Sequence, residues 1–82
     1  MKNERKRLID EISRHRNKAF ELLKTSERFH EESRNAATFK EEIETMKKIV
    51  DCNCEAFSET VEANKLTREF INKTERKDGF ED

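Results

Sequence analysis

Apolar residues recur at a seven-residue interval along most of this chain. From position 8, eight of the ten residues at this interval are apolar. A composition of 32% apolar residues would give about three by chance. A seven-residue period is typical of α-helices that pack lengthwise against other helices. The series is Leu8, His15, Leu22, Phe29, Ala36, Ile43, Val50, Phe57, Asn64 and Ile71.

A second, weaker column accompanies this series and changes side midway. In the first half it lies four residues further on, and in the second half it lies three residues further on. A column that switches sides indicates a break or a stutter in the helical repeat near the middle of the chain. The first set is Ile12, Ala19, Ser26 and Ser33, and the second is Phe39, Met46, Asn53 and Thr60.

Helix start and stop signals lie in the same middle stretch. Thr38 and Glu41 fit a capping box, in which the Thr hydroxyl accepts from the N3 amide and the Glu side chain reaches back to the Thr amide. Asn35 is a residue type that can end the preceding helix. We therefore expect an all-α hairpin, with helices at about 3–34 and about 38–74 and a turn at about 35–37. The alternative is one continuous long helix in a coiled-coil dimer, because Ala36 and Ala37 propagate helix well.

Folding back predicts which residues meet. Antiparallel partners should have numbers that add to about 72, so Phe29 would face Ile43, and Leu22 would face Val50. Two helices alone form a thin core. Further apolar residues widen the stripe, so we expect two hairpins to pair into a four-helix bundle. These residues are Ile9, Phe20, Leu23, Ile49, Leu66 and Phe70.

Composition supports helices and argues against a sheet. The chain has no Pro and a single Gly, although 45% of its 82 residues are charged. Sheets need turns, which depend on Gly, Pro, Asn and Asp. Full disorder is disfavoured because the apolar residues keep a period. Residues 75–82 hold the only Gly and one apolar residue, so we expect a flexible acidic tail there.

Charge is unevenly spread, although the formal net charge is only −1. Residues 1–24 carry eight basic and four acidic residues, and the remainder carries ten basic and fifteen acidic residues. Opposite-signed halves favour antiparallel pairing, although each exposed ion pair contributes little. No apolar run reaches the length of a membrane span, and no signal-peptide core follows the basic start. We therefore expect a cytoplasmic protein.

No motif in the sequence predicts catalysis, a cofactor or a metal. Cys52 and Cys54 point to nearly opposite sides of a helix, so one metal ion cannot bind both. His15 falls in the apolar series, where a polar residue sets the register of packed helices or, as an alternative, acts as a pH switch. Gly-rich phosphate loops, H-E-x-x-H and G-x-S-x-G are absent from the sequence. We expect a protein that is not an enzyme.

The function that we expect is protein–protein interaction through helix–helix contacts, as a small helical adaptor, inhibitor or assembly factor. Its partners would be a second copy of itself and another protein. The alternative is a nucleic-acid-binding regulator that uses basic residues of the first helix, and a structural rod is a third class. The predicted helix-interface residues are Leu8, Ile12, Leu22, Phe29, Ile43, Val50, Phe57 and Ile71. The candidate nucleic-acid contacts are Arg5, Lys6, Arg7 and Arg14.

Overall fold

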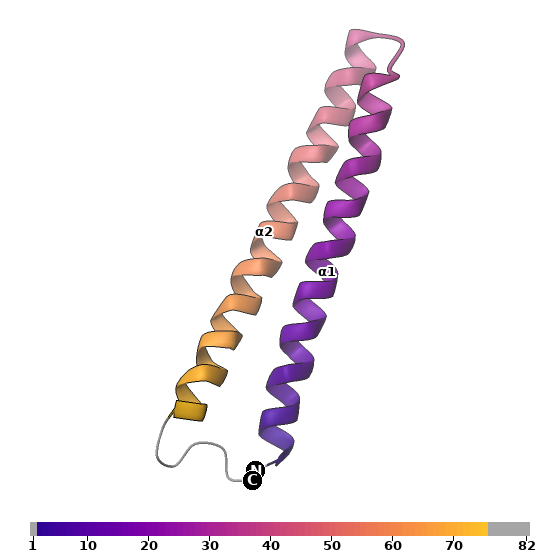
Figure 1. Ribbon diagram of the computed structural model, residues 1–82. Helices are drawn as coiled ribbons and strands as arrows, with labels where there is room; N and C mark the ends of the chain where they lie inside the picture. Colours follow the sequence, from indigo (N-terminus) through magenta and orange to yellow (C-terminus); the bar gives the residue numbers. More distant parts are fainter. Residues whose placement is uncertain (1, 76–82) are drawn as a thin grey trace.

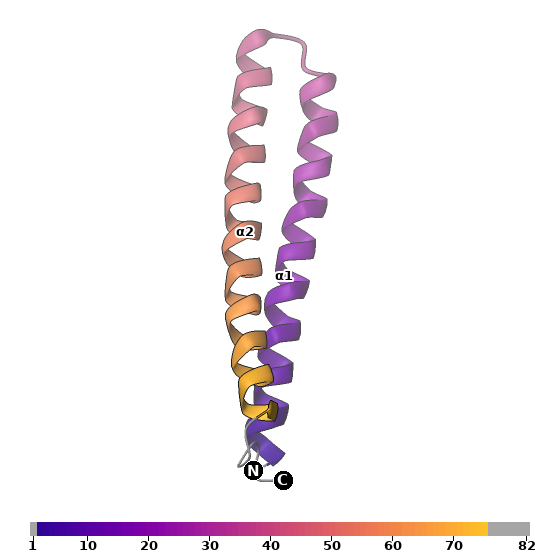
Figure 2. The same cartoon turned by 60° about the vertical axis from the view of Figure 1, so that its left-hand side comes forward.

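Two long antiparallel helices make up the fold. The computed structural model describes residues 2–75, which contain α1 (Lys2–Arg34) and α2 (Phe39–Glu75) and no strand. The two views in Figures 1 and 2 agree that the helices lie side by side along their whole length. The longest dimension is 61 Å, whereas one continuous helix of this length would reach about 120 Å. The hairpin is therefore confirmed and the continuous helix is excluded.

The observed helix ends fall within one residue of the predicted ends. The expectation of a flexible acidic tail concerns residues that lie, apart from Glu75, outside the described part of the chain. The Asp51–Cys54 stretch contains residue types that form helix poorly, yet α2 runs through it without a break. Packing of one helix face against α1 outweighs this weak local preference, since tertiary contacts supply most of the stability of protein helices.

The turn between the helices is held by capping hydrogen bonds. The Asn35 amide donates to the carbonyl oxygens of Glu31 and Glu32, which satisfies the last turn of α1. The Glu41 amide donates to Thr38 Oγ1 at 3.2 Å, so Thr38 is the N-cap of α2 as predicted. The reciprocal bond differs from the prediction, because Glu41 Oε2 accepts from the Ala37 amide at 3.1 Å and not from Thr38.

The core between the helices is thin and contains many small side chains. Leu8 is 1% exposed and is the largest fully buried side chain among the described residues. Half of the buried apolar residues are alanines, which let two helix backbones approach closely. The buried apolar residues are Leu8, Ile12, Ala19, Ile49, Ala56 and Ala63, and Ser26 is buried with them.

Candidate functional site

The contact between the helices follows one heptad stripe on each of them. On α1 the residues that turn toward α2 are those predicted from the sequence: Leu8 and Ile12 are buried, and Leu22 and Phe29 are partly buried. On α2 the buried column is Ile49, Ala56 and Ala63, spaced seven residues apart. A column of partly buried residues alternates with it along α2: Thr45, Cys52, Glu59 and Leu66.

Polar contacts across the stripe fix its register. His15 Nδ1 hydrogen-bonds Glu59 Oε2, and Lys18 Nζ lies 3.3 Å from Glu59 Oε1. Lys73 and Glu4 form an ion pair near the open end of the hairpin. The hydrogen bond from His15, and then the contact with Lys18, lower the pKa of the Glu59 carboxyl below its usual 4.5. A charged Glu59 therefore stabilises this register, which agrees with the prediction that His15 sets it.

The pairing predicted for the second helix is wrong. Val50 was expected to face Leu22, but it is 58% exposed, and Phe57, also a predicted interface residue, is 71% exposed. Ile43 and Ile71 also lie on the solvent side of α2 in the hairpin. The paired residues have numbers that add to 74 or 77 and not to 72, and α2 is turned so that its column of small residues faces α1. Ala19 then lies at about the level of Ala56, and Ile12 at about the level of Ala63, so small side chains keep the two backbones close.

The exposed stripe of α2 is the most unusual surface of the described residues. It follows heptad spacing of its own and contains no charged residue in eleven positions, where a composition of 45% charged residues would give about five. It begins at Phe39, which is 75% exposed. The stripe consists of Phe39, Ile43, Met46, Val50, Asn53, Phe57, Thr60, Asn64, Thr67, Ile71 and Thr74, of which all but the partly buried Thr67 are exposed.

Apolar residues of α1 extend this stripe into one face of the hairpin. The opposite face is polar, since Lys18 and Glu55 line one hollow there and Glu32 and Glu41 line another. Each of these residues flanks one side of the contact between the helices. Ile9, Phe20 and Leu23 of α1 are all exposed. Their heptad positions place them on the side of the helix–helix contact that is away from these hollows, which is also the side of the α2 stripe. We call the α2 stripe and these three residues together the open face.

The threonine hydroxyls at the C-terminal end of the open face donate their hydrogen bonds within α2 and not to water. The hydroxyls of Thr60, Thr67 and Thr74 each donate to the carbonyl oxygen four residues earlier, at 2.7–2.9 Å. Such bonds satisfy the hydroxyl within its own helix, so covering these residues leaves no unpaired donor. Nearer the turn, a shallow hollow of about 390 Å³ is lined by Ile43, Met46 and Val50, with Lys47 and Asp51 at its rim.

The open face exposes more apolar area than an ordinary monomer surface. From their exposed fractions, its nine large apolar side chains leave about 900 Å² in water, taking about 200 Å² for a fully exposed Phe and about 150–190 Å² for the others. The largest apolar patch on a soluble monomer is about 300–600 Å². A standard protein interface covers about 800 Å² on each partner. The open face therefore has the size and character of a docking surface for helices.

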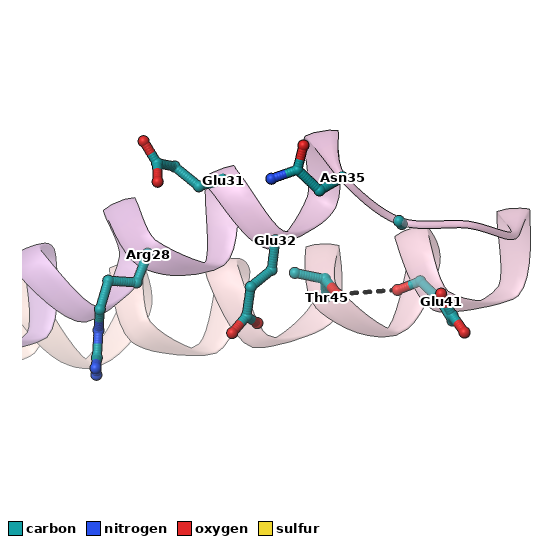
Figure 3. Close-up of a pocket in the computed structure, with 7 residues that line it drawn as sticks. Arg28, Glu31, Glu32, Asn35, Glu41 and Thr45 are labelled. Atoms are coloured by element: carbon teal, nitrogen blue, oxygen red, sulfur yellow. Dashed lines mark hydrogen bonds between the residues drawn. The ribbon is translucent and has the colours of Figure 1, made fainter.

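The hollow beside the turn shows no convergent chemistry. It measures about 540 Å³ and is lined by Arg28, Glu31 and Glu32 of α1 together with Glu41 and Thr45 of α2. In Figure 3 the Glu31 side chain points away from those of Arg28 and Glu32, and the hydrogen bond drawn joins the Thr45 hydroxyl to the Glu41 backbone carbonyl. These side chains are arranged as a solvated surface and not as a site that grips one ligand.

Other candidate chemistry is scattered over the described residues. Cys52 and Cys54 are both free thiols. Within residues 2–75, no three His, Cys, Asp or Glu side chains gather as metal ligands would, and neither helix is long and apolar enough to cross a bilayer. Arg5, Lys6, Arg7 and Arg14 are all exposed, Arg7 pairs with Glu11 at 3.7 Å, and Lys6 lies on another side of α1 from Arg7 and Arg14. Nucleic-acid contact by these residues stays a prediction.

Sequence reasoning missed the column of α2 that faces α1. The series Ile49, Ala56, Ala63 and Phe70 is apolar at all four positions, so its period was visible in the sequence. It was passed over because alanines contribute less apolar area than the neighbouring Val50 and Phe57. No protein-family model, no curated protein and no solved structure matches this chain, so no family is assigned to it.

Proposed function

We propose that this chain is a non-enzymatic protein–protein interaction module that works through helix–helix contacts on its open face. The observation that carries the proposal is the uncharged heptad stripe of α2, which lies in solvent while a neighbouring stripe packs on α1. The two stripes are separated by about 100° around α2. A helix with two such stripes fits a bundle, in which each helix has two neighbours. Adaptors, inhibitors and assembly factors of this size act through such contacts.

The first occupant of the open face is a second copy of the chain. Two hairpins stacked face to face form a four-helix bundle and remove about 900 Å² of apolar surface from each. A second copy would add buried apolar area to the thin core of the hairpin. It buries few large side chains, and small scaffolds without a disulfide or a metal are commonly stabilised by oligomerisation.

Sedimentation equilibrium over a wide range of protein concentrations tests this function. We expect the wild-type chain to approach twice its 9.8 kDa monomer mass at micromolar concentration. Val50→Glu places a charge in the middle of the stripe and should leave the chain monomeric, since burying an unpaired charge is costly. Ser58→Glu is the matched control, because Ser58 is exposed on the polar side of α2. A wild-type chain that stays monomeric at about 1 mM, or a Val50→Glu chain that dimerises as well as wild type, would falsify the proposal.

A further inference from the structure

We infer that the second copy docks antiparallel, with α2 against α2 and a two-fold axis that crosses the open face at the level of position 55, so that the two hairpin turns lie at opposite ends of the bundle. This inference rests on the proposed function and specifies the arrangement of its complex. Three independent features of the open face determine the arrangement: the length of the uncharged stripe, the level of the apolar residues of α1, and the placement of the charges that flank them.

The stripe of α2 sets the register. In a two-fold antiparallel pair, opposite residues have numbers with a constant sum. Covering the whole apolar stripe requires Phe39 to meet Ile71 of the second copy, which gives a sum of 110. The same sum brings one heptad column opposite the other, as antiparallel helices require. It places Val50 opposite Thr60 and Phe57 opposite Asn53, so that an apolar side chain meets an uncharged polar one in each of these layers.

The apolar residues of α1 lie at the same level as this axis. Two of the three polar contacts described above between the helices, Lys18 with Glu59 and Lys73 with Glu4, join residues whose numbers add to 77, and the third, His15 with Glu59, gives 74. We take the levels of the α1 residues from the sum of 77. By that alignment Phe20 lies level with Phe57, and Leu23 lies level with Cys54. The axis required by α2 therefore passes beside the apolar pair that α1 contributes. Stacking the two copies about this axis brings Phe20 and Leu23 of one chain onto the same residues of the other.

Charges on α1 favour this arrangement over the alternatives. Arg16 lies level with Val61 and Glu27 lies level with Val50, which puts them six and five residues to either side of the axis. The antiparallel dimer thus brings Arg16 of each copy to Glu27 of the other. If α2 packed instead on α1 of the second copy, the uncharged stripe would cover Arg16 and leave it without a partner.

Paired cysteine variants test the arrangement directly. In a chain with Cys52→Ala and Cys54→Ser, single cysteines are placed by Lys47→Cys or by Val61→Cys, seven residues to either side of Cys54 on the outer flank of the open face. A short bismaleimide should cross-link a mixture of the two variants to each other and should cross-link neither variant to itself, because the like positions lie about 20 Å apart. Self-cross-linking of either variant, or a dimer in which the mixture fails to cross-link, would overturn the inference.

A charge exchange provides a second, non-covalent test. Arg16→Glu and Glu27→Arg should each weaken self-association about tenfold, since two like-charged contacts form per dimer. The chain that carries both changes should recover wild-type affinity, because the pair is restored with its signs reversed. A double variant as weak as the single ones would contradict the arrangement. Failure of the wild-type chain to dimerise would overturn the proposed function itself, whereas a dimer with the wrong cross-links overturns only the antiparallel geometry.

Discussion

Replacing Phe57 by Ala separates the role of the open face from that of the hairpin core. At 71% exposure, Phe57 leaves about 140 Å² in water in the single chain. Alanine keeps part of that area, so the dimer loses about 90 Å² of burial per chain, or about 2 kcal/mol at 25 cal/mol per Å². Two-fold symmetry doubles the loss to about 4–5 kcal/mol per dimer, which corresponds to a roughly thousandfold weaker dissociation constant.

The assay is sedimentation velocity over serial dilution, with circular dichroism to follow helix content. The stability of the monomeric hairpin should hardly change, because the side chain makes little contact with α1. Ser58→Ala, the next residue along and also exposed, is the matched control and should dimerise like the wild-type chain. A Phe57→Ala dissociation constant within about threefold of wild type would refute the assignment of the open face as the interface. If the dilute, monomeric Phe57→Ala chain had less helix than the wild-type chain, Phe57 would instead belong to the hairpin core.

Four further predictions concern the hairpin itself. Leu8→Ala should cost about 2–5 kcal/mol of unfolding free energy, measured by urea denaturation, whatever the protein concentration. Ala63→Leu should cost about 1–3 kcal/mol in the same assay because it forces the helices apart, and an unchanged midpoint would contradict the close approach. Thr38→Ala should cost about 0.5–2 kcal/mol by loss of the N-cap, and Thr38→Ser should restore it. The lowered pKa of Glu59 stabilises the fold above pH 4.5. That contribution disappears as the pH falls through the lowered pKa, so Glu59→Gln should flatten the loss of melting temperature below pH 4.5. An equally steep loss in that variant would argue against the contact with His15.

Local sequence signals determined where the helices begin and end. Thr38 and Glu41 encode the start of α2 within a few residues of chain, and the hydrogen bond from the Glu41 amide to Thr38 shows that local code in use. The absence of Pro and the scarcity of Gly left no other interruption between positions 2 and 75. The heptad of α1 was likewise legible, because the predicted residues Leu8, Ile12, Leu22 and Phe29 lie on the face that turns toward α2.

Tertiary structure alone decided which side of α2 faces α1. The sequence contains two seven-residue columns in α2, one headed by Ile49 and one by Ile43, and hydrophobicity favours the second because its members are larger. Packing reverses that preference. The alanines of the first column let the two helix backbones approach closely, and that orientation brings Glu59 to His15 and Lys18. Side-chain packing and charge pairing between the helices depend on the residues of both helices, so the periodicity of one helix does not predict them. The larger column is left in solvent as the open face for that same reason.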